Sequence, residues 1–410
     1  MTFGDERGRN VLKKDAEMEF SIVSHGSASD APADVLRDTL SKLNGPPSMV
    51  FASVSIEADL AGLQKIIDPA LPLHGSTTCL GVMTDEGAFV QAGRGCGFLA
   101  ISDPAGAYGS AMVAVDGSDI EAAAERAVLM ALDRAQRPGE TPELIWLTAT
   151  PGIEERVIAS IHQTLGEGVP ICGGSAADNE VAGDWMVFDG SQTHSAGISI
   201  SVLFPSVTVG YAFHSGYRPT QTKGRVSASS GRQILSIDGR PGAVVYNEWT
   251  QGRIEHALTH GGSVIANTSL APLGRSRDSV AGFDYYLLSH PEAVNEDGAL
   301  ALFSDISVGD EIVLMEGTAD NLVQRAGRVA ENALSMARLE PANLSGALVI
   351  YCAGCMLTVQ DRMDEVASGL REVLGEKPFL GSFTFGEQGC FIGGSNHHGN
   401  LMISVVVFGA

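Results

Sequence analysis

The chain has 410 residues, of which 44% are hydrophobic and 18% are charged. This length exceeds what one hydrophobic core usually fills, and the hydrophobic content is sufficient for two or three cores, so disorder and a coiled coil are both excluded. The 26 Lys and Arg face 49 Asp and Glu, which gives a net charge of −23 without any Lys/Arg cluster. Nucleic-acid binding depends on cationic side chains that replace phosphate counterions. The composition therefore predicts a small molecule or another protein as partner, and no nucleic acid.

The amino-terminal segment is polar and charged, and it lacks the apolar stretch of a secretory signal, so we expect residues 1–20 to form a flexible tail. The longest apolar runs, such as Leu401–Phe408, are much shorter than a membrane span. Six cysteines spread over the whole chain do not form a disulfide framework. These features predict a cytoplasmic protein without a membrane partner.

Three segments, which start at Met49, Leu144 and Ala347, share one plan. Each has a short apolar run, then a stretch of helical periodicity, then a turn of small residues and a final apolar strand. The turns contain Gly-Ser pairs in matching places, as in Gly75-Ser76. The plan predicts a mixed α/β fold built of repeated strand–helix–strand–hairpin units, with layered sheets and helices.

An insertion from about residue 206 to residue 343 separates the second segment from the third. It contains a strand-like stretch, a turn-rich stretch and two helical stretches, the longer of which is Asn321–Leu339. We therefore expect two pseudo-related lobes, residues 21–208 with the first two units and residues 209–410 with the insertion and the third unit.

The sequence lacks a P-loop, an HExxH motif, a GxSxG motif and the protein-kinase motifs. Cys352-Ala-Gly-Cys355 follows a predicted strand and precedes a predicted helix, which is the position of a redox cysteine pair. The strand phase predicts that Cys352 is buried and that Cys355 is the exposed candidate. A pair of buried structural cysteines is the alternative interpretation.

Histidines are the other candidates for chemistry. His256 and His260 share a face if a helix runs through both, and they then fit a metal site, a haem site or two solvated side chains at a helix end. His397 and His398 lie in a glycine-rich hairpin, where an exposed turn is expected. His214 ends a predicted strand and is expected to line a cavity.

The glycine turns and the closing hairpin resemble those of the FIST (F-box and intracellular signal transduction) family, with its amino-terminal and carboxy-terminal domains. The resemblance runs from about residue 22 to the carboxy terminus. It departs from the family pattern at Cys79-Leu80-Gly81, where Ala-Gly-Glu is usual, and at Cys355, where Arg is usual. The matching stretches are HGSTTCLG, CGGSAADN with DWMVFDG, SIDGRPGAVVYNEW, IYCAGCM, and LGSFTFGEQG followed by HHGNLM.

The resemblance implies a non-enzymatic sensory module that binds a small ligand, such as an amino acid or another carboxylate. Its signal would pass to a separate partner, a histidine kinase or a cyclic-di-nucleotide enzyme. Some members of the family are haem proteins that respond to nitric oxide, so a haem sensor is the alternative, with His256, His260, His214 and His398 as candidate haem ligands. A thiol-dependent enzyme that uses Cys355 is the second alternative.

Glycine turns after strands expose backbone N–H groups, which suit a carboxylate ligand. The polar side chains beside these turns are the predicted ligand-binding residues. The other interpretation of the same residues is that they only cap the turns. The residues are Ser76, Thr77, Ser175, Asp178, Ser382, Thr384 and Glu387.

Overall fold

The computed structural model describes residues 19–410, apart from residues 91, 92, 118 and 281. The tail predicted for residues 1–20 lies almost entirely outside the described residues. Within the described part, no helix is long and apolar enough to cross a membrane.

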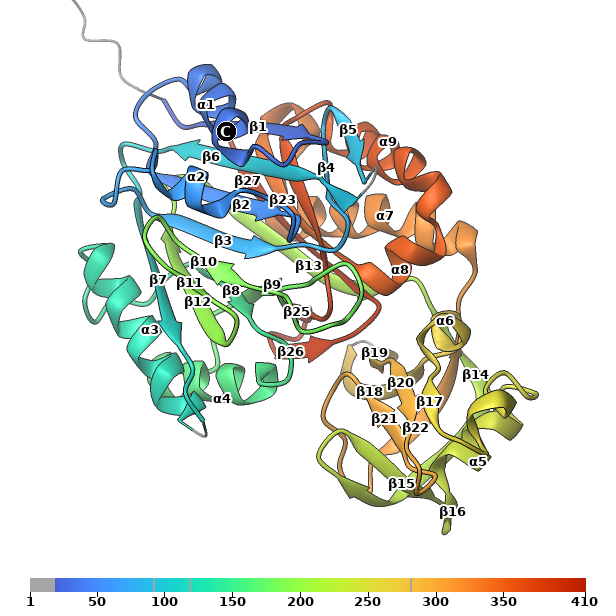
Figure 1. The fold of residues 1–410 in the computed structure, drawn as a ribbon. Coiled ribbons are helices and arrows are strands. Elements are labelled where there is room, and N and C mark those ends of the chain that lie inside the picture. The colour runs from blue at the N-terminus through green and yellow to red at the C-terminus, as the bar shows by residue number, and fades with distance from the viewer. Residues whose placement is uncertain (1–18, 91–92, 118, 281) are drawn as a thin grey trace, which may run out of the picture.

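Three units of the chain fold in the same way, which confirms the predicted α/β class and its repeated units (Figure 1). The first unit consists of β1 (Ser21–Ser27), α1 (Pro32–Lys42), β2 (Met49–Val54), α2 (Leu60–Gln64), β3 (Leu73–Thr77) and β6 (Cys96–Ser102). The second consists of β7 (Ala107–Ala114), α3 (Ile120–Arg134), β8 (Leu144–Ala149), α4 (Glu154–Leu165), β9 (Ile171–Gly174) and β12 (Gly197–Phe204). The third consists of β13 (Val209–Ser215), α7 (Ala319–Ala337), β23 (Leu344–Cys352), α8 (Ala353–Thr358), α9 (Met363–Leu374), β24 (Phe379–Thr384) and β27 (Met402–Gly409).

Each unit also has a two-stranded hairpin that joins the sheet of a different unit. The first hairpin, β4 (Val82–Thr84) with β5 (Gly87–Phe89), pairs with β24 of the third unit. The second, β10 (Val187–Phe188) with β11 (Thr193–His194), pairs with β3 of the first unit. The third, β25 (Glu387–Cys390) with β26 (Asn396–Gly399), pairs with β9 of the second unit. The three six-stranded sheets therefore have the same strand order, and the units are linked in a closed ring.

The sheets bury apolar side chains on both faces. In each unit the second and third strands are parallel. Parallel strands that are buried on both faces have nearly continuous apolar sequences, as in the fully buried β8. Helices cover the outer faces, and the inner faces pack against one another in a core that Phe51, Trp146 and Leu348 share, one from each unit. The rings of Phe51 and Trp146 lie edge to face, 5.7 Å apart. Each unit therefore depends on the other two for its core.

An inserted domain, residues 218–316, separates β13 from α7. Its core contains Ile234, Tyr246 and Ile312, and it lies beside the β25–β26 end of the repeats, in yellow to orange in Figure 1. Its elements are β14 (Arg218–Ser230), β15 (Gln233–Ile237), β16 (Arg240–Pro241), α5 (Gly242–Trp249), β17 (Gly262–Ser263), α6 (Ile265–Thr268), β18 (Leu273–Val280), β19 (Phe283–Ser289), β20 (Pro291–Val294), β21 (Leu300–Leu302) and β22 (Glu311–Glu316).

The helix that would have carried both His256 and His260 is absent. Helix α5 ends at Trp249, and Gln251 and Gly252 then have positive φ angles of 56° and 93°, which a right-handed helix does not tolerate. A short 3₁₀ turn (Glu255–Ala257) follows, so the two imidazoles do not share a helical face.

Candidate functional site between the repeats and the inserted domain

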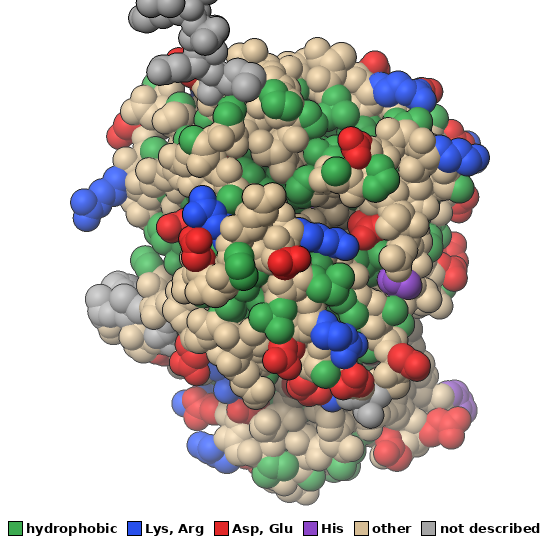
Figure 2. Space-filling view, turned by 90° about the vertical axis from the view of Figure 1, so that its left-hand side faces the viewer, with side chains coloured by type: hydrophobic (Ala, Val, Ile, Leu, Met, Phe, Trp, Pro, Cys, Tyr) green, Lys and Arg blue, Asp and Glu red, His purple; other side chains and the backbone are tan. Residues whose placement is uncertain are grey.

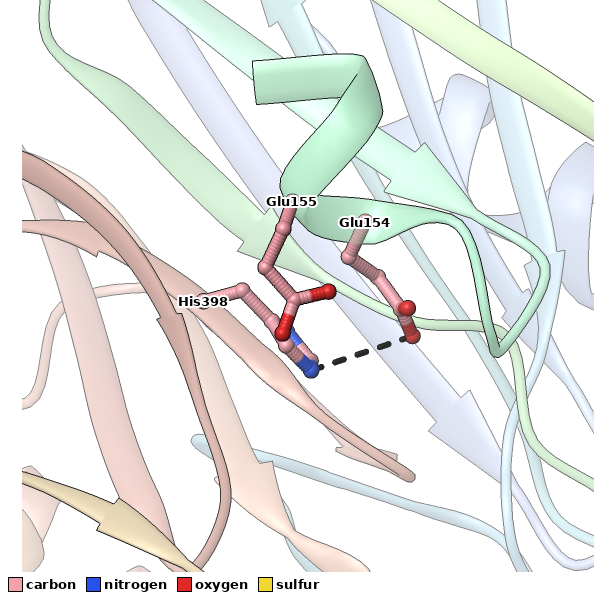
Figure 3. Close-up of side chains that lie close together, drawn as sticks. All are labelled: Glu154, Glu155 and His398. Carbon is pink, nitrogen blue, oxygen red and sulfur yellow. Dashed lines mark ion pairs between the residues drawn. The ribbon is translucent and has the colours of Figure 1, made fainter. Parts of the chain in front are cut away.

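Charged side chains gather where the second unit, the exchanged hairpin of the third unit and the inserted domain meet. Glu154 and Glu155 form the first turn of α4, where carboxylates favour the helix dipole. His398 lies on β26 and approaches them from the other side, as Figure 3 shows. Arg232 comes from the turn between β14 and β15 of the inserted domain. The hairpin exchange is what brings His398 next to α4.

Glu154 is the centre of this cluster, with only 1% of its surface exposed. Its Oε1 accepts a hydrogen bond from Ser175 Oγ at 2.7 Å, and its Oε2 accepts from Arg232 Nη2 at 2.7 Å and from the Gly152 N–H at 2.9 Å. Burial alone would raise the pKa of Glu154, but His398, Arg232 and the hydrogen bond from Ser175 outweigh it and lower that pKa. The side chain is therefore held as a carboxylate.

Arg232 ties the inserted domain to the repeats. Its Nη2 also donates to Glu155 Oε2 at 2.6 Å, its Nε donates to Asp305 Oδ1 at 3.2 Å, and its Nη1 donates to the Phe303 carbonyl at 2.8 Å. Burial lowers the pKa of Arg232, but Glu154 and Glu155 outweigh that and raise it. The Asp305 N–H completes the link by donating to Glu155 Oε1 at 2.8 Å. We call Glu154, Glu155, Arg232 and Asp305 the interdomain ion cluster.

Glu154, Glu155 and His398 offer ligand atoms within 4.8 Å of one another, which is close enough for a metal site. The Arg232 guanidinium, however, already donates to both carboxylates. A metal ion would have to displace this cation and leave it buried beside a second positive charge. The donor set is therefore occupied by an internal cation and does not fit a metal.

The prediction that His398 lies in an exposed turn is wrong, because the strand pair that carries it is covered by α4 and by the inserted domain, and only 2% of His398 is exposed. Its Nδ1 lies 3.1 Å from Gln388 Nε2, which also donates to Ser175 Oγ at 3.2 Å. A Cβ atom on Gly386 would lie 2.2 Å from His398 Cε1, so only glycine leaves room for the ring. The Ser175 hydroxyl donates to Glu154 and not to the imidazole, so these residues do not form a serine–histidine nucleophile.

A cleft with a volume of about 340 Å³ opens beside the interdomain ion cluster. The inserted domain contributes Arg275, Arg277 and Asp305 to its walls. The repeats contribute Glu155 and the side chains of three histidines, His162, His397 and His398. Groups of both charge signs therefore face one solvent-accessible space.

Arg275 is the most deeply buried cation of this cleft, with 5% of its surface exposed. Its Nη1 donates to the Asp305 carbonyl at 2.6 Å and lies 3.6 Å from Asp310 Oδ2, and its Nη2 donates to Ser289 Oγ at 3.0 Å. Its buried Nε has no hydrogen-bond partner among the described residues. Burial, together with the neighbouring charge of Arg277, lowers the pKa of Arg275 to about 10. Guanidinium groups that line a cleft are suited to pair with a carboxylate, and here Arg275 and Arg277 supply two of them.

The predicted ligand-binding residues separate into two groups. Ser76, Ser382 and Thr384 line a cavity where the three units meet, together with His74. Its volume is only about 10 Å³, enough for roughly one water molecule and not for an amino acid. Burial lowers the pKa of His74 to about 3, so its ring is a neutral member of this core.

The remaining predicted residues, apart from Ser175, have structural partners. Thr77 Oγ1 accepts from the Met186 N–H at 2.8 Å, and the Asp178 carboxylate accepts from the backbone N–H groups of residues 180–184. Glu387 is fully buried and accepts from Thr384 Oγ1 at 3.0 Å and from the Met402 N–H at 2.9 Å. Burial, and next the Cys352 thiol, raise the pKa of Glu387 well above its usual range. For these residues the geometry matches the turn-capping interpretation.

The other predicted histidines lie away from this site. His256 and His260 are exposed on the inserted domain, and His214 lines a different cavity, as expected. Cys355, expected to be exposed, is 1% exposed, because α8 packs it against β23 and the Tyr217 hydroxyl, 3.6 Å from its Sγ. Cys352 is buried as predicted, and burial raises the pKa of its thiol well above the usual value.

The sequence did not single out Glu154, Arg232 or Arg275. The Glu154-Glu155 pair at the start of a predicted helix was a usable signal, because acidic residues in a first turn mark a helix start and can also receive a ligand or a cation. The two arginines lie in a domain whose position against the repeats is set by tertiary contacts. No local pattern brings them together.

Comparison with known proteins identifies the family. The FIST N domain matches residues 48–240, and the FIST C domain matches residues 243–390. No curated protein matches the sequence. Among solved structures, a cyanuric acid hydrolase from A. caulinodans is similar, with 12% identity, a TM-score of 0.40, and coverage of 96% of this chain and 100% of that chain.

A second cyanuric acid hydrolase structure, described as an innovation by structural concatenation, is similar at 9% identity and a TM-score of 0.35, over 95% of this chain and 99% of that chain. The two family models together span most of the sequence and both halves of the fold. The chain belongs to the FIST family, whose domains serve in sensory signal transduction.

Proposed function

We propose that this protein is a non-enzymatic sensor that binds a free amino acid, or a closely related small carboxylate, in the cleft beside the interdomain ion cluster. The observation that carries the proposal is the pairing of charges in the cleft. Arg275 and Arg277 form its basic side, and Glu155 and Asp305 form its acidic side. A zwitterion with a carboxylate and an ammonium group one carbon apart complements both sides at once.

The carboxylate of the ligand would lie toward Arg275 and Arg277, which both line the cleft. The ammonium group would lie toward Asp305, the more exposed of the two lining carboxylates that Arg232 contacts. The imidazoles of His162 and His397 would provide further polar contacts. The volume of about 340 Å³ is at the lower end of the range for small-molecule sites, which favours a small ligand.

Signalling would follow from the position of the cleft. A ligand that contacts both the inserted domain and the repeats changes the free energy of one arrangement of the two relative to others. The family membership supports a separate signalling polypeptide as the receiver, and we propose a histidine kinase or a cyclic-di-nucleotide enzyme in this role.

Isothermal titration of the full chain with the common amino acids tests the proposal, with the corresponding amines and N-acetyl derivatives as matched ligands that lack one charge. We expect one or a few amino acids to bind with micromolar affinity, and both derivatives to bind at least about tenfold more weakly. Arg277→Gln should weaken binding, whereas Arg218→Gln, an exposed cation of the same sheet, should leave it unchanged. Absence of binding tighter than millimolar, or equal binding of amines and amino acids, would contradict the proposal.

A haem sensor of nitric oxide is the alternative function. An axial histidine needs a ring nitrogen with a free lone pair. His214 Nδ1 lies 2.8 Å from the Ser215 nitrogen and 3.1 Å from the Ser215 carbonyl oxygen, and both nitrogens of His398 have polar neighbours. We rank the haem function second, because His398 is enclosed by these neighbours and His256 and His260 are on an exposed turn. A Soret band after haem addition, lost in His214→Ala or His256→Ala, would reverse this assignment.

A further inference from the structure

A second cavity, with a volume of about 380 Å³, opens between α7, β13 and the tip of the β25–β26 hairpin. It has no lining residue in common with the cleft of the candidate site. Its walls are mainly apolar and aromatic, and they include Tyr211, Phe213, Tyr285, Met336 and Ile392. Ile392 is 67% exposed and Met336 is 42% exposed, so large apolar side chains stand at the cavity with much of their surface open to solvent.

Arg325, on α7, is the charged residue of this lining. Its Nε is shielded from solvent and has no hydrogen-bond partner, and no ion pair to Arg325 occurs among the described residues. Within the same residues Arg218 and Arg328 also lack an ion pair, but both are exposed, whereas Arg325 is half-buried. Burial, together with Arg328, lowers the pKa of Arg325, which is the expected effect of an uncompensated cation.

Three further polar side chains lie near Arg325 in the lining. Asn332 and Ser335 follow it along α7, at helical spacing on the same face. His214 adds an imidazole to the lining, whose Nδ1 lies within hydrogen-bond distance of both the N–H and the carbonyl of Ser215 and whose Nε2 is not used in that contact. Burial, and next the charge of Arg325, lower the pKa of His214 to about 4, so the ring is neutral at pH 7. The cavity thus combines hydrogen-bond donors and one positive charge with aromatic walls.

We propose that this cavity is a second binding site, for a hydrophobic monocarboxylate with an aromatic body. The carboxylate pairs with the Arg325 guanidinium, which matches its planar shape and supplies the charge that the protein itself does not neutralise. The aromatic body packs against Tyr285 and Phe213. A phosphate ester is a poorer match, because its second negative charge would find a single cation.

The site lies where the inserted domain meets the third unit. Tyr285 belongs to β19 of the inserted domain, Phe213 to β13 of the third unit, and Ile392 to the exchanged hairpin region. An occupant would therefore contact the same two bodies that the interdomain ion cluster connects, from a different position. It is a site for a second input, whose existence does not depend on amino-acid binding in the cleft.

The test uses the full chain and 1-naphthylacetate, titrated by calorimetry, with 1-naphthaleneacetamide as the neutral ligand of the same shape. We expect the acid to bind at least about tenfold more tightly than the amide, since one charge-assisted contact distinguishes them. Arg325→Met should remove this preference. Arg328→Met is the matched control, because Arg328 is exposed on the same helix, bonded to Gln324 Oε1 at 3.2 Å, and outside the cavity.

Equal binding of acid and amide to the unaltered protein, or no binding of either, overturns the proposal without any variant. An equal loss in Arg325→Met and Arg328→Met also overturns it. Ser335→Trp, which fills the cavity, should abolish binding of both naphthyl ligands and leave amino-acid titration in the cleft unchanged. Because the two titrations use different ligands and different residues, failure of the proposed sensor function and failure of this second site are distinguishable.

Discussion

Removal of the Arg232 side-chain charge is the sharpest test of the interdomain ion cluster. Arg232→Met leaves Glu154, which is 1% exposed, without its cation and close to Glu155. Removing one partner of a buried ion pair costs about 3 to 5 kcal/mol. The Arg232 side chain is 20% exposed, so we expect a loss of about 3 kcal/mol, near the lower end of that range.

The measurement is urea unfolding followed by circular dichroism at pH 7, with hydrogen exchange at the amino terminus of α4 as a local readout. The matched control is Arg240→Met, because Arg240 makes an exposed ion pair with Glu248 in the same inserted domain. This control should unfold at the urea concentration of the unaltered protein. In Arg232→Met, exchange should accelerate at α4 before global unfolding begins.

The pH dependence of the free energy of unfolding should also differ between the unaltered protein and Arg232→Met. In the unaltered protein the pKa of Glu154 is lowered on folding, so its contribution to stability is present above its unfolded pKa and is lost as the pH falls below it. Without Arg232, only His398, Ser175 and the backbone oppose burial, so the folded pKa of Glu154 should be lowered less. The variant should therefore lose less stability than the unaltered protein as the pH falls below the unfolded pKa of this carboxyl. Equal stability of Arg232→Met and Arg240→Met, or an unchanged pH dependence, would refute the reasoning.

Three further outcomes are expected. Burial lowers the pKa of His74 to about 3, so its ring stays neutral in the folded protein, whereas the unfolded ring takes up a proton below pH 6.5. In urea unfolding, the stability advantage of the unaltered protein over His74→Gln should therefore shrink by about 2 kcal/mol between pH 7 and pH 5. A constant difference would contradict the burial of this ring. Cys355 is 1% exposed, so it should resist iodoacetamide in the folded protein and react only after denaturation, as measured by mass spectrometry. Rapid labelling of the native protein would instead support the thiol-dependent enzyme that uses Cys355. Gly173→Ala should lower the melting temperature sharply, because the added Cβ would lie 1.9 Å from the Leu147 carbonyl oxygen and the φ angle at this residue is +147°. Gly168→Ala is the control and should have little effect, because nothing lies within 4 Å of its added Cβ. Equal melting temperatures of the two variants would count against the strand pairing at Gly173.

The sequence was informative about the units and much less so about the site. Apolar runs such as that of β8 and the helical spacing of α9 predicted the repeated α/β plan, because each depends on local periodicity. The hairpin exchange is not a local property, since β25 looks the same in sequence whether it pairs with its own unit or with β9. The burial of His398 follows from that exchange, and so the exposed-turn prediction failed.

The prediction of the site residues was limited in the same way, because it relied on a local turn motif. Ser175 was selected because it follows a glycine turn, and it does lie in the charged cluster, but through Glu154 and not through a ligand-binding turn. Ser76 and Ser382 were selected by the same rule and lie in the core where the units meet. A turn motif predicts where backbone donors occur. It does not predict which turns remain open to solvent after the three sheets have packed.

The charged side chains on the surface are distributed differently from those in the two cavities. On the face drawn in Figure 2, acidic and basic side chains are interspersed, and the basic ones do not gather into a patch. The cations that matter for the two proposed sites, Arg275 and Arg325, are instead withdrawn into cavities. The charge of the ligand would therefore be selected inside the protein.

The cyclic exchange of hairpins has a consequence for how the chain can be divided. The first and third units are joined by Thr84 and Leu380, which pair in register although they lie near opposite ends of the described chain. A fragment that stops between the two family matches, after residue 240, would cut the inserted domain within β16 and leave the β9 edge without its partner β25. Such an open strand edge attracts other chains. Halves of this protein should therefore be recovered as aggregates when produced alone and as a native complex only when produced together.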